Sequence, residues 1–78
     1  MSGDKIAKLV RMANQIGDYF APFEAPASWQ GAATHLKKFW TPKMIGEIVT
    51  HARSGGHDLN PTAKAAVESL EKVQAGNG

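Results

Sequence analysis

Proline and glycine divide the sequence into four segments, each with the length and pattern of an amphipathic helix. Ala21-Pro22 ends the first segment, because the residue before a proline resists helical geometry. Thr41-Pro42 and Asn60-Pro61 each place a capping side chain directly before a proline, a preferred helix start. Gly55-Gly56 supplies a left-handed stop between these two starts. We therefore predict helices over about residues 4–20, 27–40, 42–53 and 61–75.

Each segment carries an apolar stripe at helical spacing. At 100° per residue, the first stripe spans an arc roughly 120° wide, which is the width of a core-facing helix surface. The four stripes are Ile6, Leu9, Val10, Ala13, Ile16, Gly17 and Phe20; Trp29, Ala32, Ala33, Leu36 and Trp40; Met44, Ile45, Ile48, Val49 and Ala52; and Ala63, Ala66, Val67, Leu70 and Val73. No stretch alternates with a period of two, so we predict no sheet. The predicted fold is all-α, a small compact bundle of about four short helices.

The size of the chain limits what such a bundle can do alone. With 78 residues we predict one helical domain over residues 4–75, with flexible termini at 1–3 and 76–78. A domain of this size buries only about 60% of the surface that its unfolded chain exposes, so a deep catalytic pocket is hard to build. Apolar runs are far shorter than the roughly 20 residues of a membrane-spanning helix, and residues 1–5 lack the apolar run of a secretory signal, so we expect neither feature. We therefore expect a soluble, cytoplasmic protein with no membrane partner.

Residue types that can act in catalysis or bind metals are present, but they do not form a known catalytic or metal-binding motif. The chain has no cysteine, which excludes a thiol nucleophile, a cysteine zinc site and a cysteine-ligated iron–sulfur cluster. His35, His51 and His57 form neither an HxH nor an HExxH pattern, so independent histidines fit better than a metal site. No serine has a GxSxG context, and no Rossmann fingerprint is present. We expect no catalytic residue, no metal and no cofactor in this chain.

A short basic and aromatic stretch at residues 37–43 keeps a second function open. Lysines beside aromatic residues can bind single-stranded nucleic acid by charge and stacking. Here Trp40 already belongs to an apolar stripe, and Lys37 and Lys38 occupy the solvated face of the same helix. The net charge of +2 is also small for a nucleic-acid-binding domain. A small helical nucleic-acid-binding or regulatory adaptor domain stays the alternative, but nucleic acid is not the expected partner.

Surplus apolar residues give the first positive indication of function. Met12, Tyr19 and Phe39 lie beside the stripes, and Met44 could join them. Short helices that cross at odd angles would bury these side chains within the domain. Alternatively a partner covers them, since exposed methionine and aromatic residues beside arginine are typical of interface centres. The sequence leaves both interpretations open.

Two longer segments together resemble one protein family. They are Lys8–Phe20, which reads KLVRMANQIGDYF, and His35–Met44, which reads HLKKFWTPKM. Both resemble the delta subunit of the soluble, NAD-dependent, molybdenum-containing formate dehydrogenases of bacteria, and the resemblance covers about residues 5–70. The family tends to have Asp-Pro-Arg where this chain has Thr41-Pro42-Lys43. Lys43 keeps the charge but lacks the planar fork of arginine.

The resemblance implies a non-catalytic accessory subunit of a formate dehydrogenase complex, without an active site of its own. The implied partner is the catalytic alpha subunit. The implied enzyme carries a bis-molybdopterin guanine dinucleotide (bis-MGD) cofactor with molybdenum or tungsten, iron–sulfur clusters and FMN. The delta subunit would support complex assembly, cofactor insertion or activity. The candidate partner-binding residues are Arg11, Met12, Asn14, Gln15, Tyr19, His35, Phe39, Trp40, Lys43 and Met44. Asn14 and Trp40 could equally be structural, as a hydrogen-bonding boundary residue and a core side chain.

Overall fold

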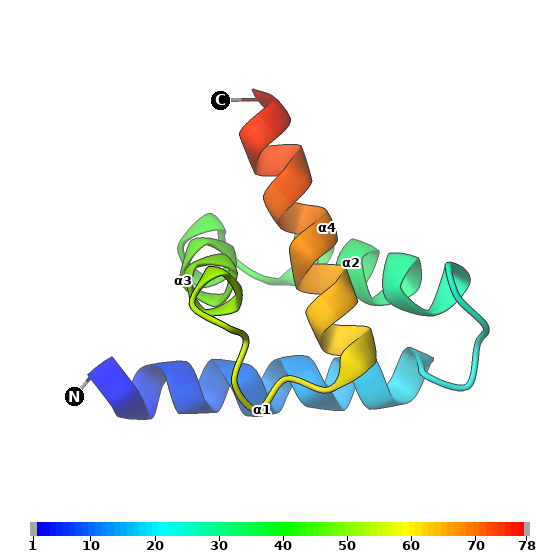
Figure 1. Ribbon diagram of the computed structural model, residues 1–78, viewed down its shortest axis with the longest axis horizontal. Coiled ribbons are helices and arrows are strands. Elements are labelled where there is room, and N and C mark those ends of the chain that lie inside the picture. The colour runs from blue at the N-terminus through cyan, green and yellow to red at the C-terminus, as the bar shows by residue number, and fades with distance from the viewer. Residues whose placement is uncertain (1, 78) are drawn as a thin grey trace.

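Four helices form the fold in the computed structural model, which describes the backbone of residues 2–77 and the side chains of residues 5–71. They are α1 (Ser2–Phe20), α2 (Ala27–Phe39), α3 (Pro42–Arg53) and α4 (Pro61–Asn77), and residues 2–77 contain no strand. The predicted all-α fold is confirmed (Figure 1). α1 and α4 each extend two residues further than predicted. Flexible termini at 1–3 and 76–78 stay a prediction, because residues 1 and 78 and the side chains at both ends lie outside the described part.

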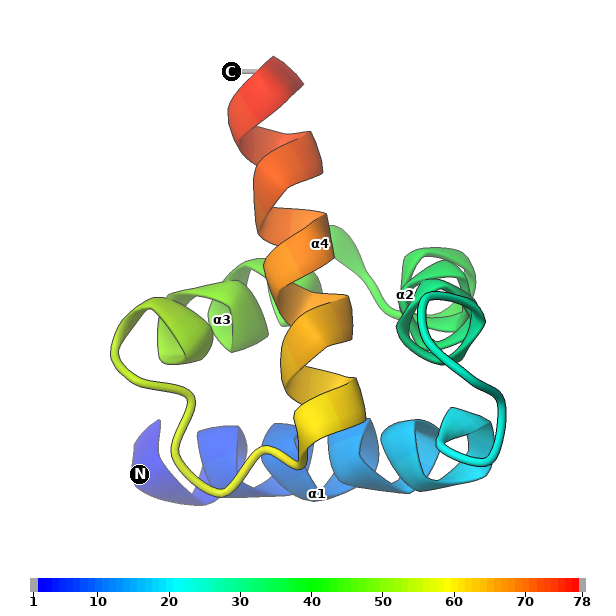
Figure 2. The ribbon, with the colours of Figure 1, turned by 45° about the vertical axis from the view of Figure 1, so that its right-hand side comes forward.

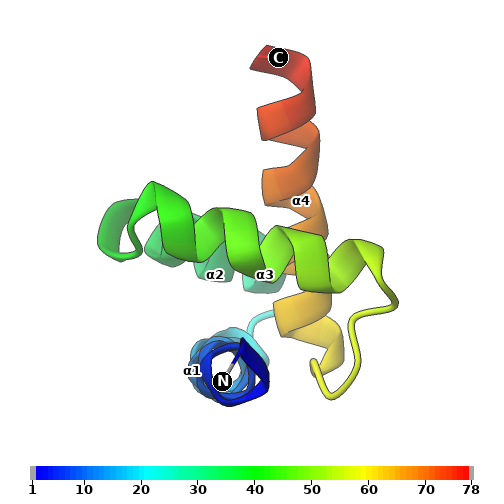
Figure 3. The same cartoon turned by 90° about the vertical axis from the view of Figure 1, so that its left-hand side faces the viewer.

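α4 stands across the other helices and packs against all three of them. It rises steeply from α1 in each of three views, with its C-terminal end projecting beyond the other helices (Figure 1, Figure 2, Figure 3). α2 and α3 lie on either side of α4 (Figure 2). The radius of gyration, 11.4 Å, matches the value of about 11.5 Å expected for a globular chain of this length. The helices therefore form a compact domain with steep crossings and not an aligned bundle.

The starts of α3 and α4 follow the predicted capping signals. The Thr41 Oγ1 accepts a hydrogen bond from the Met44 N–H at 3.2 Å. The Asn60 Oδ1 accepts one from the Ala63 N–H at 2.8 Å. Each bond satisfies a backbone donor that the first helical turn leaves free, and a proline follows each cap.

The ends of α2 and α3 depend on backbone geometry. Gly55 and Gly56 have φ angles of 118° and 63°, and the Gly56 N–H donates to the His51 carbonyl at 3.1 Å. Both φ angles favour glycine, so the predicted stop is confirmed. The prediction was one residue too long for α2, which ends at Phe39. Trp40 is extended, with φ −92° and ψ 144°, and begins the turn into α3.

The predicted stripes meet in one hydrophobic core. Its buried apolar side chains all belong to those stripes: Leu9, Val10, Ala13, Ala32, Ala33, Leu36, Trp40, Ile48, Val49, Ala63, Ala66, Val67 and Leu70. Half-buried side chains pack around it: Ile6, Met12, Ile16, Phe20, Trp29, Met44, Ile45, Ala52 and Leu59. Val73, the last predicted member, lies outside the described side chains.

Small residues allow α1 and α4 to approach closely. A Cβ added at Gly17 would lie 2.6 Å from the Asn60 Oδ1 and 2.9 Å from the Ala63 backbone nitrogen. Real Cβ atoms do not come so close to other atoms, so position 17 has no room for a side chain. Gly17 therefore fixes how near the start of α4 lies to α1, and with it the orientation of the domain's longest helices.

Candidate partner-binding surface

Five aromatic rings form a continuous cluster where α1, the following connector and α2 meet. The ring centroids are 5.0 Å apart for Tyr19 and Phe20, and 6.0 Å apart for Phe20 and Phe23. They are 6.5 Å apart for Phe20 and His35, and 4.6 Å apart for His35 and Phe39. These separations lie in the range of favourable aromatic pairs. We call these five residues the aromatic cluster.

Three members of the aromatic cluster face outward. Tyr19 is 72% exposed, Phe23 53% and Phe39 70%, while Phe20 and His35 are half-buried beneath them. The core is closed by other residues, so folding leaves these three large side chains in water. A contiguous exposed apolar surface of this kind is typical of a site that binds another molecule.

Phe20 can lie directly on α2 because position 31 is a glycine. A Cβ at Gly31 would lie 2.7 Å from the ring carbons Cδ1 and Cε1 of Phe20. The ring thus occupies the space that any other residue at position 31 would fill. This contact attaches the centre of the aromatic cluster to α2 and sets the positions of the outer rings.

An open groove of about 490 Å³ runs along α2 beside the aromatic cluster. Its lining consists of Phe20, Ala27, Gln30, Gly31, Thr34, His35, Lys38 and Phe39. Gln30, Thr34 and Lys38 are four residues apart, so they share one helix face and form the polar wall of the groove. All three are exposed, and none makes a side-chain hydrogen bond or ion pair within residues 5–71.

The structure brings some of the predicted contact residues together. Tyr19, His35 and Phe39 meet in the aromatic cluster although they come from two helices. Arg11 and Gln15 are also exposed, but they lie on α1 outside the cluster.

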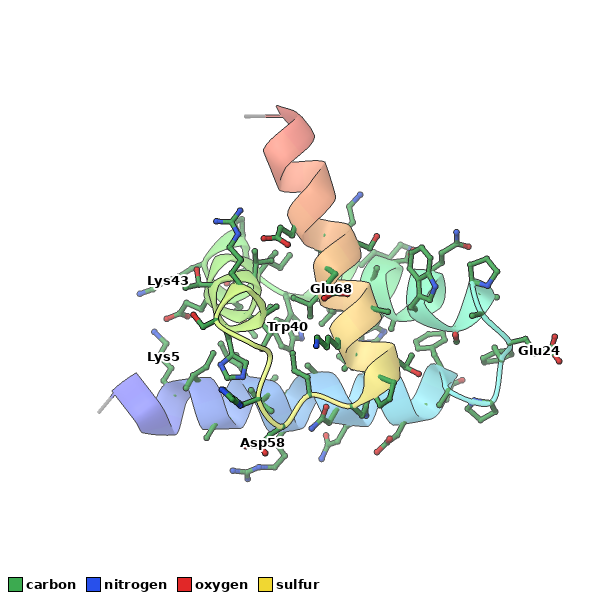
Figure 4. The ribbon with its side chains drawn as sticks, viewed as in Figure 1. Lys5, Glu24, Trp40, Lys43, Asp58 and Glu68 are labelled. Atoms are coloured by element: carbon green, nitrogen blue, oxygen red, sulfur yellow. The ribbon has the colours of Figure 1, made fainter. Side chains whose placement is uncertain are left out.

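Lys43 is exposed and separate from this surface. It lies in the first turn of α3. Figure 4 shows it at the opposite end of the molecule from Glu24, which belongs to the connector beside Phe23. The ten predicted residues therefore do not form one continuous patch.

The other four predicted contact residues have evident roles in the fold. Trp40 is 6% exposed and lies at the centre of the molecule (Figure 4). Met12 and Met44 are half-buried against the core, as steep helix crossings allow. Asn14 forms side-chain hydrogen bonds with the segment that leads into α4. These contacts match the structural alternatives that the sequence left open for Asn14 and Trp40.

Phe23 was missed by the sequence analysis. It lies in the connector between Pro22 and Pro26, where helical periodicity says nothing about burial. The signal was nevertheless present: a large aromatic residue in a proline-flanked connector has no apolar stripe to join. Such a residue either packs into the core or forms part of an exposed surface. Phe23 forms part of an exposed surface.

Among residues 5–71, the remaining titratable side chains show no arrangement typical of a metal site. No group of three His, Asp or Glu side chains in the described part could hold a metal ion. His51 Nε2 lies 2.7 Å from the His57 carbonyl oxygen, so that ring nitrogen is occupied by a backbone contact. In the same part of the chain, no helix is both long enough and apolar enough to cross a membrane.

The molecule is a small all-α domain with an exposed aromatic cluster. Comparison with known families makes this specific, because residues 8–67 match the NADH-dependent formate dehydrogenase delta subunit FdsD. The chain belongs to this family and is a delta subunit of the NAD-dependent formate dehydrogenase complex, as its sequence predicted. The matched range includes the whole aromatic cluster. Neither the curated proteins nor the solved structures give a match.

Proposed function

We propose that this delta subunit is a non-catalytic accessory subunit that binds the catalytic alpha subunit through the aromatic cluster. The exposure of Tyr19, Phe23 and Phe39 around a core that is complete without them carries the proposal. Aromatic side chains are enriched at the centres of protein interfaces, where their burial contributes most to affinity. Family membership supplies a complex in which such a surface has a partner.

The residue types of this chain favour a role in binding a partner over a role in electron transfer or catalysis. It has no cysteine with which to ligate an iron–sulfur cluster. We propose that the bis-MGD cofactor with its molybdenum or tungsten, the iron–sulfur clusters and FMN all belong to other subunits. The delta chain then acts in the cytoplasm beside them without a cofactor of its own.

Binding of this kind would support assembly of the complex, cofactor insertion or activity. A protein that binds only the folded form of its partner shifts the folding equilibrium of that partner toward this form. A rigid helical surface with aromatic contacts provides such stabilisation without any chemistry. The delta subunit would thereby hold the alpha subunit in the conformation that receives its cofactor or retains it.

The test replaces the three exposed aromatic residues together, as Tyr19→Ser, Phe23→Ser and Phe39→Ser. Tagged wild-type protein should recover the alpha subunit from the native bacterium grown on formate, identified by mass spectrometry and metal analysis. The triple variant should recover little of it while keeping its helical circular dichroism spectrum. A matched control, Lys8→Ser with Lys64→Ser, changes exposed polar residues outside the aromatic cluster and outside the predicted contact residues, and it should behave like wild type.

Two results would contradict the proposal. The first is normal recovery of the alpha subunit by the triple variant. The second is recovery of nucleic acid alone by the wild type, with binding that falls steeply between about 50 and 200 mM salt. That second result would favour the alternative function, a small nucleic-acid-binding or regulatory adaptor.

A further inference from the structure

The polar wall of the groove is positively charged at one end. Lys38 lines the groove, and Lys37 beside it is exposed in the same last turn of α2. Neither lysine belongs to an ion pair within residues 5–71. Exposed Glu24 precedes the other end of α2. The surface beside the aromatic cluster therefore has an uncompensated positive charge at its Phe39 end.

The helix itself explains only part of this arrangement. A cation in the last turn of a helix interacts favourably with the helix dipole, and that role would affect folding alone. The polar wall offers more, because Gln30 and Thr34 continue it with a carboxamide and a hydroxyl that have no partner within residues 5–71. This surface thus has hydrogen-bond donors and cations around an apolar centre. A partner surface with hydrogen-bond acceptors and carboxylates around its own apolar centre would complement it.

We infer that the partner surface covering the aromatic cluster is apolar at its centre and carries carboxylates that face Lys38 and Lys37. This inference rests on the proposed function, since it takes the partner to be a subunit of the formate dehydrogenase. The aromatic cluster supplies the contact area, and the polar wall sets the orientation. Carboxylates fit at the Phe39 end, whereas Glu24 would repel them at the other end.

The test measures association of the full delta chain with formate dehydrogenase purified from a strain that lacks the delta subunit. The double variant Lys37→Glu, Lys38→Glu should lower the association rate constant by about tenfold in 0.1 M salt. The loss should nearly vanish in 1 M salt, because the Debye length falls from about 10 Å to about 3 Å. The neutral variant Lys37→Gln, Lys38→Gln should give a smaller loss, and a circular dichroism spectrum like that of the wild type at the assay temperature would show that the effect is not on folding.

A matched control separates local from general electrostatics. Lys8→Glu with Lys64→Glu changes the net charge equally, uses exposed lysines and leaves the groove intact. It should alter the rate constant by less than about twofold. Equal slowing by both double variants would overturn the assignment of carboxylates to this wall.

The remaining outcomes distinguish this inference from the proposed function. Normal association of the Lys37→Glu, Lys38→Glu variant, while the triple aromatic variant fails to bind, overturns the inference alone. No association by the wild type overturns both. If the two lysines govern binding of a single-stranded oligonucleotide but not association with the enzyme, the wall binds nucleic acid instead.

Discussion

Asn14 on α1 and Asn60 at the start of α4 hydrogen-bond to each other across 46 residues of sequence. The Asn60 N–H donates to the Asn14 Oδ1 at 2.8 Å, and the Asn60 Nδ2 donates to the Asn14 carbonyl at 3.1 Å. The Asn14 Nδ2 in turn donates to the Asp58 carbonyl at 2.7 Å. The Asn14 side chain thus connects α1 both to the loop before α4 and to Asn60, the residue that caps α4.

Asn14→Ala is expected to lower the free energy of unfolding by about 1–3 kcal/mol, because it leaves part-buried partners unpaired. Urea denaturation followed by circular dichroism measures this. Gln15→Ala, at the exposed neighbouring position, should change the value by no more than about 0.5 kcal/mol. If Asn14→Ala left stability unchanged but weakened binding to the alpha subunit, Asn14 would be a contact residue and not a structural one.

Two glycines in helices offer a matched test of the close approach of α1 and α4. Gly17→Ala should lower the free energy of unfolding by about 1–3 kcal/mol, because the new methyl group meets the backbone of α4. Gly46→Ala on α3 should raise it by up to about 1 kcal/mol, since the methyl group enters open space and alanine favours the helix. Thermal unfolding compares the two variants directly. Stabilisation by both would mean that the helices do not meet at Gly17.

The helix ends were predictable because their signals are local. Thr41 and Asn60 cap the residue three positions later, and Gly55-Gly56 act within one turn of α3. The bond between Asn14 and Asn60 could not be predicted, because it depends on the angle at which α4 crosses α1. That angle in turn depends on how closely the two helices can approach, for example at Gly17. The hydrophobic periodicity of the sequence carries no information on this approach.

The same limit applies to the candidate contact residues. Met12 and Tyr19 lie on one flank of α1 by helical spacing, yet Met12 packs against the core and Tyr19 is 72% exposed. The difference depends on which side chains of the other helices lie beside each position, which helical spacing does not record. Phe23, outside every helix, joins the aromatic cluster through its contact with Phe20, which no helical spacing indicates.

Truncation of the adjacent residues Phe39 and Trp40 should affect different properties, binding for Phe39 and stability for Trp40. Trp40→Ala should cost about 3–5 kcal/mol, because it empties part of the core, and a domain this small then unfolds in part. Phe39→Ala should change stability by no more than about 0.5 kcal/mol but weaken binding to the alpha subunit by about tenfold or more. Melting temperature and dissociation constant together separate the two effects. Wild-type affinity of Phe39→Ala would remove this residue from the surface.

Gly31→Ala tests whether the geometry of the aromatic cluster matters, and not only its composition. The added methyl group displaces the Phe20 ring, which can swing aside, so stability should change by less than about 1 kcal/mol. The outer rings move with Phe20, and binding to the alpha subunit should weaken several-fold. Unfolding and binding curves of the same preparation provide the comparison. Unchanged affinity would indicate that the partner tolerates a rearranged cluster.

Hydroxyl-radical footprinting of the delta subunit, free and in the formate dehydrogenase complex, shows whether a partner covers the aromatic cluster. Oxidation rates report the solvent exposure of individual side chains, and aromatic side chains react readily. We expect strong protection of Tyr19, Phe23 and Phe39 in the complex, whereas the oxidation of Met44, which packs against the core, should change little. Equal oxidation of those three aromatic residues in both states, with protection elsewhere on the chain, would contradict this expectation.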